Sequence, residues 1–485
     1  MQTRYTSTNY PPEARDLFLQ GHQRLTLGQT QAAEACFIKA LLLAPDFVEA
    51  LINLGWVNEQ HGAVAEAEAC YKRALTLRPD CVRIYLNLGV LFLHTKRFFE
   101  SEAACRRAVQ IAPHDPEVWS QLGVLLACVQ REQEAERCFL RALELDGAHA
   151  QTRFNFSYLL LRQGRLQQGW QYLEARTQEN RWTPPEDCLR WNGEEIAGKS
   201  LLIGFEAGYG DMIQFSRYAA VLKTRGAQRV GIVCHPGLAR LLGSLGAIDT
   251  VYSLGADPSA QDWNFWAPLL SLPYHCGTTL DNIPTGIPYL SALPEDRTLW
   301  GSRLPPANCR VGLVWKGNPL FENDADRSVP ALEQFAPLGR ISGVQWISLQ
   351  KGAGEEEAQH PPAGFPLLAF GESLQDFADT AALLAHLDLV ITVDTAVAHL
   401  AGAMGKPCWV LLPNYLTDWR WLSERVDSPW YLGTMRLFRQ AKVGDWSQVI
   451  EEVAVALAAS VEHLAGIGRG NAGTHHAALA RNLTP

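Results

Sequence analysis

The first part of the chain repeats one pattern of apolar and small residues with a period of 34 positions. A glycine, an alanine, a proline and a bulky ring each recur at this step. The glycines are Gly21, Gly55, Gly89 and Gly123, the alanines Ala40, Ala74, Ala108 and Ala142, the prolines Pro45, Pro79 and Pro113, and the rings Phe37, Tyr71 and Phe139, with Cys105 in one place. Small side chains let two helices approach closely, and a proline cannot continue a helix. The pattern therefore predicts pairs of short helices stacked into a superhelix.

The repeat unit resembles a known motif. Its period agrees with the tetratricopeptide repeat (TPR), and Trp119-Ser-Gln-Leu-Gly123 reproduces the W-x-x-L-G start of that motif. The resemblance covers residues 14–178, with four clear units and a degenerate fifth over about 150–176. It implies an α superhelix whose concave groove holds an extended polypeptide.

A side-chain amide recurs two residues before three of the four motif glycines and at the corresponding place in the fifth unit. These residues are Asn53, Asn87, Gln121 and Asn155. An amide offers both a donor and an acceptor, so a row of amides can bind a peptide backbone. The alternative is that these amides only tighten the helix surface, and the pattern leaves both interpretations open.

After residue 178 the period changes to short apolar runs that alternate with helical stretches. Strands are predicted at 201–205, 229–234, 248–253, 310–315, 344–349, 388–393 and 408–412, and a last helix at about 446–465. This alternation predicts two Rossmann-like α/β domains with parallel sheets. Ligands of such sheets bind beyond the carboxyl ends of the strands.

Proline-rich stretches divide the chain further. The predicted parts are repeats at 14–178, a connector at 179–198, a first Rossmann-like domain at 199–290, a linker at 291–308, a second Rossmann-like domain at 309–466 and a disordered tail at 467–485.

Composition narrows the class of protein. The chain has 485 residues, a net charge of −9, 47% hydrophobic and 19% charged residues. This acidic balance argues against a nucleic-acid-binding protein. We expect no membrane span, because no run of about 18 apolar residues occurs. No signal peptide is expected either. The eleven cysteines form no CxxC motif and predict buried free thiols in a reducing cytoplasm.

The sharpest chemical motif follows the predicted strand 388–393. A helix begins directly after Asp394 with the small residues Ala396 and Ala398. Its free N–H groups and positive dipole end favour an anion such as a diphosphate. Alternatively, Asp394 and Thr395 simply cap the helix.

Two motifs in this half resemble one enzyme family. The run D-T-A-V-A-H-L-A-G-A-M-G-K-P at 394–407 resembles the signature of glycosyltransferase family 9, the heptosyltransferase-like enzymes with a GT-B fold. Gly208-Tyr-Gly210-Asp211 resembles the early Gly-Asp motif of that family. The resemblance covers about residues 199–465. With repeats in front, the chain resembles the TPR-linked protein glycosyltransferases, including bacterial enzymes that modify flagellin.

The resemblance implies roles for single residues. Asp211 corresponds to the general base that deprotonates the acceptor hydroxyl, although capping of a helix explains it equally well. Asp394, Thr395, Ala396 and His399 correspond to the run that binds the sugar and diphosphate of the donor. Ala396 stands where the family has glycine, and a packed core histidine is the alternative for His399.

Further donor contacts are expected after two strands of the second domain. The candidates are Lys316, Asn318, Arg327, Ser328 and Gln350. Lys316 or Arg327 could balance the leaving diphosphate without a metal, whereas exposed loop charges are the alternative. Asp324-Ala-Asp326 spells a D-x-D motif, but three-residue matches are common by chance, and we expect no metal. The cluster Trp419-Arg-Trp421 and Trp430-Tyr431 indicates core or interdomain packing, and stacking on a sugar or base is the alternative.

The sequence thus predicts a cytoplasmic glycosyltransferase that moves a sugar from a nucleotide-sugar donor to a polypeptide selected by the TPR groove. An inverting, metal-independent route follows from the family resemblance. Two alternatives stay open. One is a TPR scaffold with inactive transferase-like domains, and the other is a transferase that acts on a lipopolysaccharide-type glycan.

Overall fold

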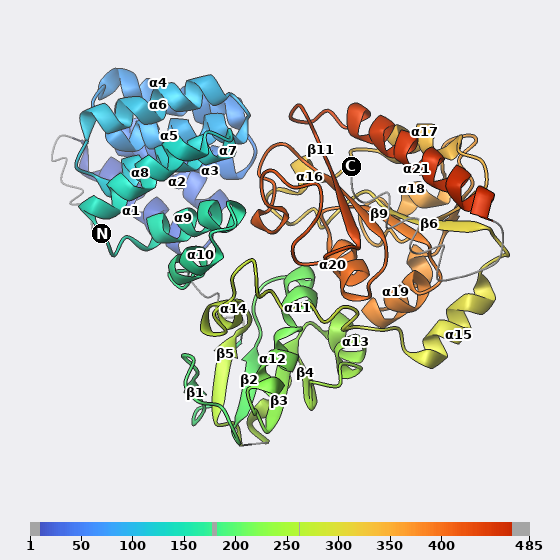
Figure 1. The fold of residues 1–485 in the computed structure, drawn as a ribbon. Helices are drawn as coiled ribbons and strands as arrows, with labels where there is room; N and C mark the ends of the chain where they lie inside the picture. The colour runs from blue at the N-terminus through green and yellow to red at the C-terminus, as the bar shows by residue number, and fades with distance from the viewer. Residues whose placement is uncertain (1–9, 177–181, 261, 468–485) are drawn as a thin grey trace. The chain divides into compact units, whose positions relative to one another are not determined.

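The computed structural model describes residues 10–176, 182–260 and 262–467 (Figure 1). They form two compact units that divide between Phe156 and Ser157. No helix within these ranges is long and apolar enough to cross a membrane. Of the predicted tail, residues 468–485 lie outside the described residues.

The first unit consists of helices that pack in successive pairs, as the 34-residue period predicts. They are α1 (Pro12–Thr26), α2 (Thr30–Leu43), α3 (Val48–Gln60), α4 (Val64–Leu77), α5 (Val82–His94), α6 (Phe98–Ile111), α7 (Pro116–Cys128), α8 (Glu132–Leu145) and the start of α9 (Ala150–Arg162). The predicted helical solenoid is confirmed.

The motif glycines are required by the packing inside each pair. A Cβ atom on Gly21 would lie 2.7 Å from the ring of Phe37, and one on Gly55 would lie 2.6 Å from the ring of Tyr71. Any larger side chain would separate the two helices of a pair. At Gly89 the place of the ring is taken by the Cys105 sulfur, 2.8 Å from the Cβ position.

Ion pairs follow the same period. Glu68 accepts from Arg97 at 2.5 Å, and one repeat later Glu102 accepts from Arg131 at 2.7 Å. The Arg97 guanidinium lowers the pKa of Glu68 to about 2. The 34-residue period thus applies to charged side chains as well as to the core glycines, and the resulting ion pairs join adjacent helix pairs.

The second unit begins inside α9, so the degenerate fifth repeat does not belong wholly to the first unit. Its next helix, α10 (Leu166–Leu173), packs on α14 (Leu272–His275) of the first sheet domain. The predicted repeat region, 14–178, therefore crosses the division between the units.

The first sheet has five parallel strands in the order β1-β5-β2-β3-β4. Its elements are β1 (Leu189–Arg190), β2 (Ser200–Gly204), α11 (Tyr209–Phe215), α12 (Tyr218–Thr224), β3 (Arg229–Cys234), η1 (Pro236–Leu238), α13 (Ala239–Gly243), β4 (Thr250–Ser253), η2 (Pro258–Ala260), β5 (Phe265–Pro268), η3 (Leu269–Ser271) and α14.

The second sheet has six parallel strands in the order β11-β10-β9-β6-β7-β8. Its elements are α15 (Pro294–Arg303), β6 (Cys309–Val314), α16 (Asp324–Arg327), η4 (Leu332–Phe335), α17 (Ala336–Gly339), β7 (Val344–Ser348), α18 (Glu355–Gln359), β8 (Leu367–Ala369), η5 (Gly371–Ser373), α19 (Phe377–Leu384), β9 (Leu389–Val393), α20 (Ala396–Ala403), β10 (Cys408–Leu412), η6 (Trp419–Trp421), β11 (Met435–Arg439) and α21 (Ser447–Ile467).

The α/β prediction is confirmed in both sheets. β9 and β10 are buried at every position, as expected for parallel strands covered on both faces. The predicted linker 291–308 contains a helix, α15, whose Trp300 is buried. All eleven cysteines are free thiols, and eight of them are buried.

Candidate active site at the meeting of α11 and α20

The two family-like motifs lie in contact within the second unit. α11 follows β2 of the first sheet, α20 follows β9 of the second, and the two helices pack on each other. A Cβ atom on Gly210 would lie 2.8 Å from the His399 ring and 3.5 Å from the Ala396 Cα atom. The glycine therefore permits this close approach, and the carboxyl ends of β2 and β9 face one site.

Asp211 is engaged at both carboxylate oxygens. Oδ2 accepts from the backbone N–H of Gly208, the N-cap residue of α11, at 2.8 Å, so the side chain of Asp211 caps the start of this helix. Oδ1 accepts from the guanidinium of Arg420. The capping interpretation is thus confirmed. It does not exclude proton transfer, because an ionised carboxylate has about four acceptor positions.

Arg420 is the main site residue that the sequence interpretation missed. Its side chain is 8% exposed and joins the two sheet domains. Nε donates to the Gln214 side chain at 2.7 Å, and Nη1 donates to both oxygens of Asp418 at 3.0 Å. Burial lowers the pKa of Arg420, but Asp418 and Asp211 outweigh this and hold it above its ordinary value. The sequence offered one signal for Arg420. This residue follows β10, and ligands of parallel sheets bind beyond the carboxyl ends of the strands.

Asp394 lies beyond the carboxyl end of β9 and is partly exposed. Close packing around the carboxyl and the negative charge of Asp418 raise its pKa from 3.8 to about 6, against the opposing charges of Arg327 and Arg420. The site therefore contains a carboxyl group whose pKa lies above the ordinary value of an aspartate.

Thr395 occupies the N-cap position of α20 without capping it through its side chain. Its hydroxyl instead pairs with the Thr392 hydroxyl at 3.0 Å. The interpretation of Thr395 as a side-chain cap is therefore wrong. Ala396, the first residue of α20, is partly exposed, so the start of this helix is accessible.

His399 is packed rather than exposed. Its Nδ1 atom lies 3.0 Å from the Tyr431 hydroxyl, and its ring stacks on Trp421 with centroids 5.3 Å apart. Burial, with the charges of Arg420 and Arg217, holds the pKa of His399 well below its ordinary value. A neutral, oriented ring results, which supports the contact between α11 and α20.

The loop after β6 carries the predicted basic residues, and each of them has an acidic partner. Lys316 pairs with Glu357, and Arg327 Nε donates to Asp324 at 3.1 Å. The charge of Arg327 acts on Asp394. Because a guanidinium engages Asp324, the first carboxylate of the D-x-D run holds the loop together.

The other three predicted donor contacts have structural partners. Ser328 Oγ accepts from Gly317 N at 2.9 Å, and exposed Asn318 accepts from Leu320 N at 3.1 Å. Gln350 is buried, and its amide accepts from two backbone N–H groups and donates to two carbonyls. No hydrogen-bonding capacity remains on this side chain, so Gln350 shapes the loop.

The repeat amides lie in the first unit and are partly used in packing. Asn53 is 3% exposed, and its oxygen accepts from Arg83 at 3.3 Å. Gln121 donates to the Leu86 carbonyl at 2.5 Å, and Asn155 accepts from Gln151 at 3.0 Å. Asn87 is partly exposed. The buried NH₂ group of Asn53, in contrast, has no hydrogen-bond partner among the residues that the structure describes.

Two family models match the chain. Residues 18–80 and 64–116 match the tetratricopeptide repeat, and residues 353–411 match glycosyltransferase family 9 (heptosyltransferase). The second match includes Asp394 and His399 but not Asp211.

One curated relative, Protein FlbA of Caulobacter vibrioides, is 27% identical over 347 residues. The match covers 64% of this chain and 55% of that protein, so the chain spans about half of the relative's length.

Solved structures of other proteins are similar to part of the chain. The pilF protein of Pseudomonas aeruginosa has 23% identity, covers 35% of this chain and 79% of its own, and gives a TM-score of 0.32. A thermophilic TPR protein of Thermus thermophilus has 22% identity, covers 33% and 87%, and gives a TM-score of 0.31. The N-terminal part of the chain thus carries tetratricopeptide repeats, and its C-terminal part contains a segment that matches glycosyltransferase family 9.

Proposed function

We propose that the protein is an inverting glycosyltransferase that moves a sugar from a nucleotide-sugar donor to a hydroxyl group of a polypeptide. The observation that carries the proposal is the contact of α11 with α20, which brings Asp211 close to the start of the helix after Asp394. Polypeptide as the acceptor class is supported by the TPR match, because TPR grooves hold extended segments. A flagellin-like acceptor agrees with the resemblance to TPR-linked enzymes.

In the proposed reaction, the acceptor oxygen forms a bond to C1 of the sugar on the face opposite the diphosphate. The bond between C1 and the diphosphate oxygen breaks, and the leaving group takes that electron pair. Asp211 accepts the hydroxyl proton through a remaining lone pair. Arg420 keeps the carboxylate oriented toward the site through its bond to Oδ1.

The second sheet domain would bind the donor. The accessible start of α20 offers backbone N–H groups and a positive dipole end to the diphosphate. The guanidinium of Arg327, whose charge already acts on Asp394, would balance the charge that develops on the leaving group. This assignment needs no metal, and we propose a metal-independent route in the cytoplasm, where the free thiols would persist.

The experiment is a calorimetric titration of the whole chain with nucleotide sugars and nucleoside diphosphates, with Asp394→Ala as the control. We expect one donor to bind the wild-type chain with a micromolar Kd. Asp394→Ala should bind the same donor at least about tenfold more weakly, which corresponds to a loss of about 1.4 kcal/mol. A folded protein that binds none of these compounds would instead favour the scaffold function.

The acceptor class needs a separate experiment. With the donor identified, transfer is measured to unfolded flagellin-like polypeptide and to lipopolysaccharide core glycan. Transfer to the glycan alone would overturn the polypeptide assignment while leaving the donor site intact.

A further inference from the structure

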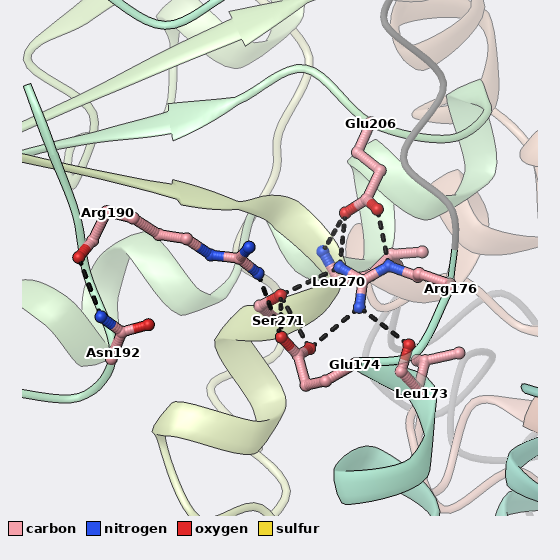
Figure 2. A network of polar contacts seen from close by, with 8 residues as sticks. All are labelled: Leu173, Glu174, Arg176, Arg190, Asn192, Glu206, Leu270 and Ser271. Carbon is pink, nitrogen blue, oxygen red and sulfur yellow. Dashed lines mark hydrogen bonds and ion pairs between the residues drawn. The ribbon is translucent and has the colours of Figure 1, made fainter. Parts of the chain in front are cut away.

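One arginine after the last repeat helix, Arg176, contacts Glu206, and Figure 2 shows this contact. Glu206 lies in the loop between β2 and α11, the helix that carries Asp211. Arg176 follows α10, and its side chain is 7% exposed. Its Nε donates to Glu206 Oε1 at 2.6 Å, and its Nη2 donates to Glu206 Oε2 at 3.0 Å. Two parallel bonds between a planar guanidinium and a carboxylate fix both distance and orientation.

Glu206 is held from a second direction as well. Its Oε2 accepts from the backbone N–H of Leu270 at 3.0 Å, in the η3 turn that follows β5 (Figure 2). Because Glu206 follows β2 after one intervening residue, these contacts anchor the loop where it leaves the sheet. The carboxylate is 14% exposed, so water screens the ion pair weakly.

The rest of the network orients Arg176. Glu174 Oε1 accepts from Arg176 Nη1 at 2.9 Å and from Ser271 Oγ at 2.8 Å. Ser271 Oγ also accepts from Arg176 Nη2 at 2.9 Å. Arg190 donates to the other oxygen of Glu174 at 3.2 Å, from the outer side of the network (Figure 2).

The segment between Glu206 and Asp211 needs such an anchor. Ala207 has φ of +65°, a left-handed conformation that costs a non-glycine residue about 1 kcal/mol or more. One residue later, the Gly208 N–H donates to Asp211. The orientation of Asp211 thus depends on the strained turn at Ala207, and Glu206 is the residue directly before this turn.

α10 also contacts the far end of the helix that carries Asp211. Trp170 is buried, packs edge-on against Phe215 at the end of α11, and donates to the Thr278 carbonyl at 3.1 Å. The last repeat helix therefore touches α11 at its end and, through Arg176, the loop before its start.

We propose that Arg176 is a positioning residue that acts through Glu206 to hold the Asp211 loop in its reactive conformation. Arg176 thereby couples the last helix of the repeat region to the acceptor side of the transferase. As far as it concerns the reaction, this inference rests on the proposed function.

The first test compares Arg176→Lys with Arg190→Lys in the full chain. Lysine keeps the charge at position 176 but loses the two-bond contact with Glu206. We expect the kcat of transfer to fall about 10- to 100-fold in Arg176→Lys, as for a small misplacement of a reacting group. The KM for donor should stay within about twofold, because the donor site lies on the other sheet. Arg190→Lys, in the same network but bonded to Glu174, should keep the wild-type kcat.

The second test does not depend on activity. Hydrogen exchange of the segment 204–216 in the ligand-free protein should become faster in Arg176→Lys and in Glu206→Gln, and stay unchanged in Arg190→Lys. Faster exchange over the whole chain would assign Arg176 to general stability and overturn the proposal.

The two tests separate the possible failures. Wild-type kcat together with wild-type exchange in Arg176→Lys would overturn the positioning role. If the wild-type chain transfers no sugar but Arg176→Lys still loosens the segment 204–216, the proposed function fails and the anchoring role is supported.

Discussion

Asp211 and Arg420 are 209 positions apart in the chain, yet they share a charged hydrogen bond in the folded protein. The same guanidinium holds Asp418, whose charge acts on Asp394. The three carboxylates are therefore electrostatically connected through one buried cation. A change at Asp211 or Asp418 should therefore alter the contacts that hold Arg420.

For Asp211→Asn we expect the rate of transfer to fall by about 100-fold or more, because an amide cannot accept the proton. Donor affinity should be retained, since the donor groups lie on α20 and the loop after β6. Calorimetry and an initial-rate assay measure the two quantities. Asp427→Asn, which removes a more exposed carboxylate paired with Arg425 at 2.7 Å, is the matched control. Unchanged turnover in Asp211→Asn would end the assignment of Asp211 as the base.

Asp394 predicts a pH dependence of stability. Its pKa is raised from 3.8 to about 6, so between these values the folded protein holds a proton that the unfolded chain has lost. The contribution of this group to the free energy of unfolding therefore falls as pH rises from about 4 to about 6. Asp394→Asn should remove this dependence. The free energy of unfolding of the variant minus that of the wild type should be about 1–3 kcal/mol more positive at pH 7 than at pH 4. Urea unfolding at both pH values measures the difference, and a difference of opposite sign would contradict it.

At the scale of elements, the contact between α11 and α20 depends on one glycine. Strands were predictable where an apolar run was long enough, as in β3 and β10. The shortest strands, β1 with two residues and β8 with three, were missed, because so few residues show no periodicity of their own. β5 and β11 were missed as well, and their place in the sheets is set by pairing with β2 and β10.

Gly210→Ala tests the helix contact. The added methyl group would lie 2.8 Å from the packed ring of His399, so the helices must separate. We expect a loss of about 1–3 kcal/mol in the free energy of unfolding and a fall in transfer rate. Gly243→Ala in α13 is the control, because no atom of the described residues lies within 4 Å of that Cβ position, and it should be neutral or slightly stabilising. Equal unfolding midpoints for the two variants would show that the contact tolerates a side chain.

At the scale of the whole molecule, the chain joins a repeat unit to a transferase-like unit. The row of amides in the repeats is the candidate device for holding a polypeptide. Its members are not equivalent, because Gln121 already donates to a backbone carbonyl whereas Asn87 is partly exposed.

If the amides bind the acceptor, Asn53→Ala combined with Asn87→Ala should weaken polypeptide binding by about 1–3 kcal/mol while donor hydrolysis stays unchanged. Fluorescence anisotropy with a labelled acceptor peptide measures the affinity. Gln110→Ala, an exposed amide on α6, is the control, and thermal unfolding checks that buried Asn53 has not destabilised the repeats. If the double variant binds the peptide with wild-type affinity, the amides serve helix packing and do not bind the acceptor.

The sequence by itself determined the repeats, the parallel sheets and the two motifs at Asp211 and Asp394. These features rest on periodicity, small residues and residue order, which local interactions along the chain enforce. Only the tertiary structure decided that Arg420 binds Asp211 and that Arg176 holds Glu206. Such partners are chosen by the packing of distant elements and leave no spacing rule in the sequence. The same packing decided that Gln350 serves the backbone and that His399 is buried, because burial and hydrogen-bond partners are properties of the whole fold.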